Sequence, residues 1–173
     1  MDIETVIVGG GHVASLVILQ PHERDKKDAN RRLPIKIGLV EATAISTGIE
    51  AVSESDPHRP SRPMTHDLLV STIHTLGYEL TAVCIVAVEG DTFFARLELT
   101  SEDGAVTSVD ARPSDALACA LRVHAPIFAT TEVLDIATMP DFEGAERELR
   151  ESELAEFHSF VEDLKPEDFT THE

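Results

Sequence analysis

The stretch ETVIVGGGHVASLVILQP, from Glu4 to Pro21, decides between two folds. Residues 9–14 fit the spacing G-x-G-x-x-A, which is typical of a dinucleotide-binding turn. Such a turn must open a helix whose N-terminus holds the pyrophosphate. Here the glycines precede a run rich in Val, Ile and Leu that ends at Pro21, and such a run is typical of a strand. We therefore interpret the glycines as a hairpin turn between two strands, which disfavours nucleotide binding.

This hairpin opens a pattern that occurs twice along the chain. The first unit predicts strands at residues 4–8, 14–19 and 33–37 and then a helix over 41–52. The second predicts strands at 82–89, 93–100 and 106–110 and then a helix over 114–123. A further helix over 65–77, with Thr65 as its N-cap and Gly77 just past its end, lies between the units. The expected fold class is α+β, a duplicated unit of three antiparallel strands plus a helix with an extra central helix.

The end of the chain differs in composition from the rest. Residues 140–173 hold 12 of the 32 acidic residues, and residues 142–166 show the apolar spacing of an amphipathic helix. We expect one domain over residues 1–139 followed by an acidic helical tail over 140–173.

Composition limits the function classes. The formal net charge is −18 over 173 residues, which disfavours a broad basic surface for nucleic acid. No apolar run approaches the length needed to cross a bilayer, and no signal peptide pattern is present, so we expect a cytoplasmic protein without a membrane partner. Cys84 and Cys119 have no partner at ligand spacing and are interpreted as core residues.

Two short segments, PMTHDLL (63–69) and VDARPSDALA (109–118), place ionisable residues where helices begin. His66 suits a general base or acid near neutral pH. Arg112 suits a bidentate contact with phosphate. The carboxylates of Asp67, Asp110 and Asp115 suit a hard divalent cation. Together these are parts that phosphodiester hydrolysis requires.

A purely structural interpretation of the same segments stays open. Asp67 and Asp115 suit the positive end of a helix dipole, and Ser114 could cap the second helix behind Pro113. Asp110 and Arg112 could pair across the turn.

Two further residues join the candidates. Glu41 begins the helix of the first unit roughly where Asp115 begins that of the second, so pseudo-symmetry would turn both toward one cleft. Arg96 alternates with Glu98 and Phe94 along a strand, so the three share one side. That side either lines a cleft or carries a surface ion pair.

Four segments, LPIKIGLVEATAI, RPMTHDLL, DTFFARLEL and VDARPSDALACALRVHAPIFATTEVLDIA, resemble in that order the bifunctional nuclease domain family. The resemblance covers residues 3–137 and implies an α+β fold, a homodimer, and cleavage of DNA and RNA. The motif positions carried over are Glu41, His66, Asp67, Asp110, Arg112, Ser114 and Asp115. The sequence departs from the family pattern at its GGGH turn and at His124, where relatives often have glycine.

The resulting expectation is a nuclease that hydrolyses phosphodiester bonds of DNA and RNA. His66, Asp67, Asp110, Arg112 and Asp115 are its expected catalytic residues. Ser114 and Arg96 are expected to bind substrate, and Glu41 with Asp115 to hold a magnesium or manganese ion. The net charge opposes this, although Arg24, Lys26, Lys27, Arg31 and Arg32 could line a dimer cleft. The alternative is a non-catalytic dimeric module that binds or regulates a protein or a small anionic ligand.

Overall fold

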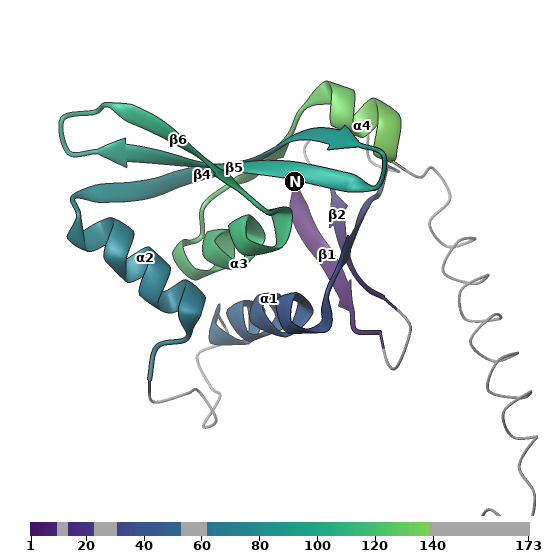
Figure 1. Ribbon diagram of the computed structural model, residues 1–173, viewed down its shortest axis with the longest axis horizontal. Coiled ribbons are helices and arrows are strands. Elements are labelled where there is room, and N and C mark those ends of the chain that lie inside the picture. Colours follow the sequence, from purple (N-terminus) through teal and green to yellow (C-terminus); the bar gives the residue numbers. More distant parts are fainter. Residues whose placement is uncertain (10–13, 23–30, 53–61, 139–173) are drawn as a thin grey trace, which may run out of the picture. The chain divides into compact units, whose positions relative to one another are not determined.

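The computed structural model describes residues 1–9, 14–22, 31–52 and 62–138 (Figure 1). The glycine turn at 10–13, the predicted tail helix and the domain boundary before residue 140 lie outside these residues, as do Arg24, Lys26 and Lys27. Residues Met1–Met139 form one compact unit.

The first repeated unit has the predicted order. Strands β1 (Asp2–Ile7), β2 (Ser15–Gln20) and β3 (Leu33–Ile37) form an antiparallel three-stranded sheet, and helix α1 (Leu39–Val52) follows. Ile7 pairs with Leu16, which confirms that the two strands on either side of the glycines are antiparallel neighbours. The apolar run after the glycines is therefore a strand, as its β-branched residues predict.

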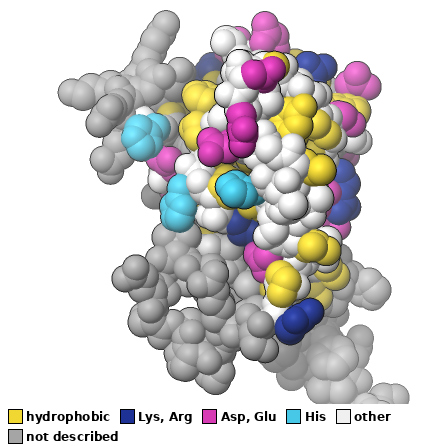
Figure 2. Space-filling view, turned by 90° about the vertical axis from the view of Figure 1, so that its left-hand side faces the viewer, with side chains coloured by type: hydrophobic (Ala, Val, Ile, Leu, Met, Phe, Trp, Pro, Cys, Tyr) yellow, Lys and Arg dark blue, Asp and Glu magenta, His cyan; other side chains and the backbone are white. Residues whose placement is uncertain are grey.

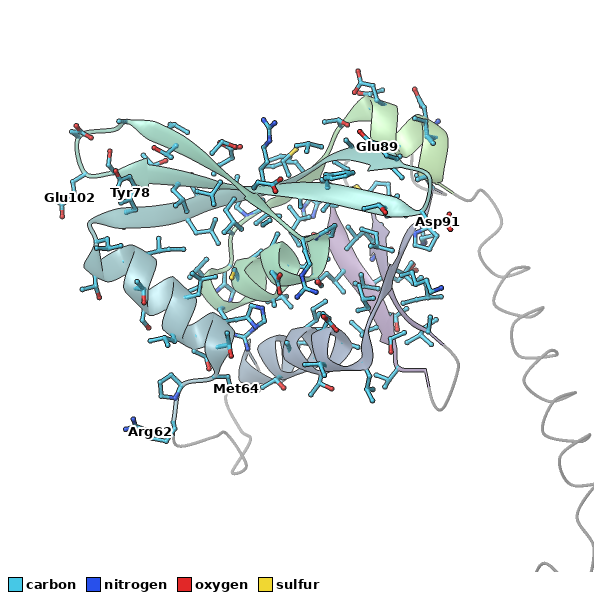
Figure 3. All side chains as sticks on the ribbon, viewed as in Figure 1. Arg62, Met64, Tyr78, Glu89, Asp91 and Glu102 are labelled. Atoms are coloured by element: carbon cyan, nitrogen blue, oxygen red, sulfur yellow. The ribbon has the colours of Figure 1, made fainter. Side chains whose placement is uncertain are left out.

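The second unit repeats the first. Strands β4 (Tyr78–Glu89), β5 (Thr92–Ser101) and β6 (Val106–Ala111) are antiparallel, and helix α3 (Pro113–Val123) follows. Figure 3 shows the β4–β5 turn at Glu89 and Asp91 and the β5–β6 turn beside Glu102, at opposite ends of the sheet. The α+β class and its duplicated unit are confirmed.

Two elements were not predicted. Strand β7 (Ile127–Ala129) joins the second sheet parallel to β4, giving the order β6-β5-β4-β7, and helix α4 (Thr131–Ala137) follows it. A strand this short shows no readable periodicity.

Helix α3 lies at the centre of the core. Its residues from Pro113 to Ala120 are buried except for Asp115, which is half-buried. It packs against α1 and beneath β4 and β5, and Figure 1 shows α1, α2 and α3 on the same side of the four-stranded sheet. The helix is enclosed on most sides, and the small side chains of its alanines allow the neighbouring elements to pack closely against it. Cys119 is part of this core, as predicted, whereas Cys84 is only half-buried.

Helix α2 (Thr65–Thr75) links the two units and begins differently from the prediction. Its N-cap is Met64, not Thr65, and the carboxylate of Asp67 accepts a hydrogen bond of 2.8 Å from the backbone N–H of Met64. A Thr N-cap would accept a hydrogen bond from the backbone N–H of the third helical residue; here the third helical residue, Asp67, instead accepts one from the backbone N–H of the cap. Gly77 follows the C-cap with φ +79°, as expected for a C′ glycine.

Helix α3 also begins earlier than it would with Ser114 as its N-cap. Its N-cap is Arg112, with Pro113 as the first helical residue and Ser114 buried as the second. Pro113 fits because the first helical N–H needs no partner within the helix.

Candidate functional site

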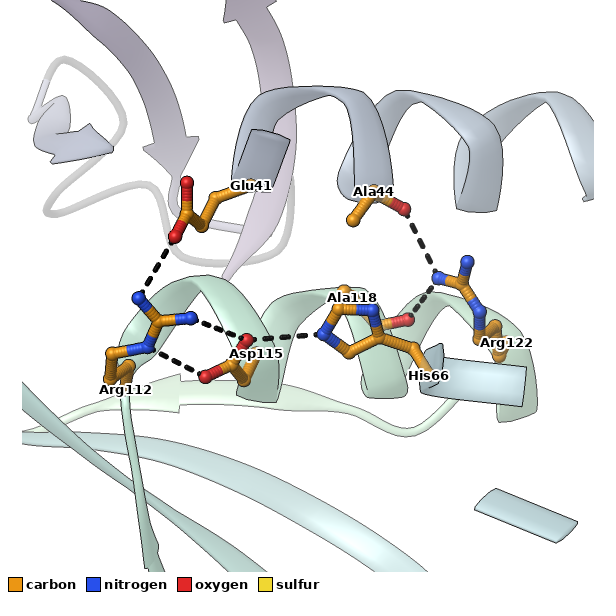
Figure 4. Close-up of polar contacts among 7 residues, drawn as sticks. All are labelled: Glu41, Ala44, His66, Arg112, Asp115, Ala118 and Arg122. Carbon is orange, nitrogen blue, oxygen red and sulfur yellow. Dashed lines mark hydrogen bonds and ion pairs between the residues drawn. The ribbon is translucent and has the colours of Figure 1, made fainter. Parts of the chain in front are cut away.

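The first turns of three helices meet at one cluster of charged side chains (Figure 4). Glu41 is the third residue of α1 and Asp115 the third residue of α3, so the two repeated units contribute equivalent positions. His66, in the first turn of α2, completes the cluster. We call Glu41, His66, Arg112 and Asp115 the helix-start cluster.

Arg112 connects the two carboxylates of the cluster. Its Nε and Nη2 donate to Oδ2 and Oδ1 of Asp115 at 2.8 and 3.1 Å, and its Nη1 donates to Oε1 of Glu41 at 2.9 Å. These hydrogen bonds raise the pKa of Arg112. The side chain is 65% exposed, and only three of its five N–H groups are used here. One N–H on each Nη therefore remains for another acceptor.

His66 and Asp115 form the second contact of the cluster. Nε2 of His66 lies 3.1 Å from Oδ1 of Asp115, and the imidazole is 14% exposed. Burial acts to raise the pKa of Asp115, but hydrogen bonds from Arg112 and His66 outweigh it, so the pKa is lowered. Asp115 is thus an ionised carboxylate held between a guanidinium and an imidazole.

Asp67 turns away from the cluster toward the other end of α3. Its Oδ1 accepts a bond of 2.5 Å from Nε of Arg122, a residue that the sequence analysis did not single out. One feature of the sequence could have identified Arg122: it is the single arginine of an apolar helix, and it lies seven positions after Asp115, on the same helical face.

Asp110 and Arg96 lie outside the cluster. They are register partners on β6 and β5. Ala95 and Leu97, which alternate with Arg96, are buried against the core, so Arg96 and Asp110 face the other side of the sheet. Asp110 does not pair with Arg112, which bonds to Asp115 and Glu41 instead. Ser114 is buried as the second residue of α3, and its role in binding substrate stays a prediction.

The predicted metal ligands, Glu41 and Asp115, are bridged by the guanidinium of Arg112. Within the part of the chain that the structure describes, no group of three His, Cys, Asp or Glu side chains is arranged to hold a metal ion. The residues as placed therefore do not fit a divalent cation between Glu41 and Asp115, and the metal stays a prediction.

A cavity of about 710 Å³ lies away from the cluster, near the C-terminal ends of α1 and α3. Its lining includes His22, His124 and Phe128 and none of the cluster residues. His124 caps α3 in the left-handed conformation, with φ +56°.

The molecular surface agrees with the negative charge of the sequence. Figure 2 shows Lys and Arg side chains scattered among carboxylates and apolar groups, with no continuous basic patch formed on that face by the described residues. Of the predicted basic residues, Arg31 pairs with Asp135 at 3.0 Å and Arg32 with Glu4 at 2.6 Å. No helix in the described part of the chain is long and apolar enough to span a membrane.

Comparison with known proteins places the chain in a family. The family model described as bifunctional nuclease domain matches residues 17–141. Two proteins from different strains of Mycobacterium tuberculosis, both described as uncharacterized, are 36% identical over 171 residues, covering 94% of this chain and 98% of theirs. The matched residues include every member of the helix-start cluster. The chain belongs to the bifunctional nuclease domain family.

Proposed function

We propose that this chain hydrolyses phosphodiester bonds of DNA and RNA at the helix-start cluster. The observation that carries the proposal is the contact between His66 and Asp115 beside an exposed guanidinium that keeps unused N–H groups. Membership of a nuclease family supports the same reaction class.

His66 is the proposed general base. Asp115 is ionised and can only accept, so a neutral imidazole bonds to it through a proton on Nε2, which leaves Nδ1 as the acceptor. Nδ1 takes a proton from a water molecule as the water oxygen attacks phosphorus, and Asp115 stabilises the imidazolium that forms. The P–O bond to the leaving oxygen breaks, and that oxygen takes a proton from solvent.

Arg112 is the proposed phosphate ligand. Its two unused N–H groups, one on each Nη, can donate to phosphate oxygens. Negative charge on these oxygens increases as the water attacks, and a fixed guanidinium stabilises that charge. Glu41 opposes the binding step, because its carboxylate already occupies Nη1.

The alternative function is a non-catalytic binding or regulatory module. One observation favours it: Glu41 and Asp115 are both paired with Arg112, and the resulting contacts join the three helices. The same network of ion pairs is expected if these residues serve only to hold the three helices together. The homodimer and the cytoplasmic location stay predictions under both functions.

Cleavage of labelled single-stranded RNA and duplex DNA by the purified protein tests the proposal. The assay is run with magnesium, with manganese and with a chelator. It includes the Asp115→Asn and His66→Gln variants, because a glutamine amide can still donate to Asp115 but cannot act as a base. Asp135→Asn, which removes an exposed ion pair outside the cluster, is the matched control.

Cleavage by the wild type and the control, with loss of about a hundredfold or more in both cluster variants, is the expected result. The variants must show normal thermal melting. Equal cleavage by all four proteins, or none by any under every metal condition, contradicts the nuclease proposal and favours the binding module.

A further inference from the structure

Arg122 is a charged side chain in the core. It lies in the last turn of α3, and its side chain is only 7% exposed. Nη1 donates to the carbonyl oxygen of Ala118 at 2.7 Å and of Ala44 at 3.2 Å, and Nε donates to Asp67 at 2.5 Å. Burying a guanidinium is costly unless hydrogen bonds replace its water. Here one guanidinium contacts three helices.

The contact to Asp67 reaches the start of α2. One oxygen of that carboxylate accepts from Arg122, and the other accepts from the backbone N–H of Met64, the N-cap. Ile73 is the one buried residue of α2 and Val70 is packed, partly buried, against the core, so apolar packing holds this helix in its middle and toward its C-terminal end. Polar contacts of Asp67 and His66 with α3 therefore fix its first turn.

We propose that Arg122 is a positioning residue for His66. By holding Asp67, it sets the place of the first turn of α2 and keeps the adjacent imidazole of His66 within hydrogen-bond distance of Asp115. The effect of Arg122 on catalysis rests on the proposed function. The effect of Arg122 on the contact between His66 and Asp115 is independent of that function.

Gly48 of α1 lies next to the guanidinium of Arg122. A Cβ atom added at Gly48 would lie 3.1 Å from Nη1 of Arg122 and 3.2 Å from Cβ of Leu121. The absence of a side chain at residue 48 thus gives the guanidinium room between α1 and α3. Because Nη1 is bound on both sides, Arg122 has little freedom to move aside.

Nitrogen NMR of the histidine side chains tests the position of His66 without any activity measurement. The ¹⁵N shifts of the His66 ring are compared in the wild type and in Arg122→Met, Arg122→Lys, Asp67→Asn and Asp115→Asn. Glu4→Gln, which removes an ion pair between β1 and Arg32 outside the helix-start cluster, is the control. His74, exposed on α2 and eight positions after His66, is the internal reference.

We expect Arg122→Met and Asp67→Asn to move the His66 ring shifts toward their values in Asp115→Asn, and Arg122→Lys to move them partway. Glu4→Gln and the His74 signals should not change. Asp67→Asn retains the size of the side chain and provides the same test if Arg122→Met does not fold. Unchanged His66 shifts in both Arg122→Met and Asp67→Asn, or equal movement of His66 and His74, would overturn the proposal.

Kinetics then measure the catalytic consequence. We expect Arg122→Met to lower kcat by about tenfold to a hundredfold, because a small misplacement of the base is costly, while KM stays within about twofold. In Asp115→Asn/Arg122→Met, the loss should equal that of Asp115→Asn alone, since both act through His66. Additive losses would overturn the effect of Arg122 on catalysis.

Absence of cleavage in the wild type would contradict the proposed function. The NMR result would still decide whether Arg122 positions His66.

Discussion

Nε2 of His66 lies 3.1 Å from Oδ1 of Asp115, although 49 positions separate the two residues in the chain. Asp115 comes from the second repeated unit, and its counterpart in the first unit, Glu41, bonds to the same arginine. His66 comes from α2, which belongs to neither unit. The duplication therefore supplies two carboxylates at equivalent helix starts, and the connecting helix supplies the imidazole that contacts one of them.

Stability should depend on pH through Asp115. Its pKa is lower in the folded protein than the unfolded value of about 3.9. A lowered folded pKa contributes stability above the unfolded pKa, and this is lost as pH falls through the folded pKa. We expect the difference in urea-unfolding free energy between wild type and Asp115→Asn to be constant near neutral pH and to shrink below about pH 4. A difference that persists in acid would show that the carboxylate charge is not responsible.

Glu41→Gln should strengthen the binding of phosphate. The substitution removes one negative charge from the cluster and weakens the competitor for Nη1 of Arg112. We expect KM for a short oligonucleotide, or Kd for a nucleoside monophosphate, to fall by about fivefold at low salt. Isothermal titration at two salt concentrations measures this, and the effect should shrink at high salt. Weaker binding in Glu41→Gln would instead make Glu41 a contributor to the site.

Gly48→Ala should destabilise the protein, although alanine is normally better than glycine in a helix by about 1 kcal/mol. The added Cβ meets Arg122 and Leu121 at 3.1 and 3.2 Å, and overpacking of this kind costs about 1 to 3 kcal/mol. We expect a net loss of about 1 kcal/mol in urea unfolding. Ser46→Ala on the same helix is the control and should change stability little. A gain in unfolding free energy in Gly48→Ala would mean that α1 and α3 can move apart at little cost.

His124→Gly should stabilise the protein. His124 holds φ +56° at the C-cap of α3, a conformation that costs a non-glycine residue about 1 kcal/mol or more. Glycine relieves this strain but loses more entropy on folding, so the expected net gain is about 0.5 kcal/mol. His124→Ala keeps the strained backbone and should show no gain. Equal losses in both variants would show that the imidazole itself contributes to stability.

Local patterns in the sequence predicted most of the fold. The β-branched runs of the two predicted strand triplets, the first of which contains the glycine hairpin, predicted the correct strand order, because alternation and turns are local signals. Strand β4 begins at Tyr78, earlier than the predicted residue 82, since it follows directly on the helix-ending Gly77. Strand β7 depends on pairing with distant β4 and left no local pattern.

The candidate site was predictable only in part. The repeat made Glu41 the counterpart of Asp115, and both indeed bond to Arg112. Asp110 lies only two positions before Arg112, but the chain leaves β6 after Ala111, so the two side chains diverge. Arg122 was missed because its role depends on α2 lying across α3, which no spacing within either helix reveals.

The wide sequence separation within the cluster has a consequence for folding. Glu41 and Arg112 are 71 positions apart, Asp67 and Arg122 are 55 apart, and His66 and Asp115 are 49 apart. Making contacts between residues so far apart in the chain requires the long loops between them to close, which costs conformational entropy. Neither repeated unit contains a complete cluster by itself, so a nascent or half-folded chain holds no assembled centre. Any chemistry performed there is confined to the fully native state.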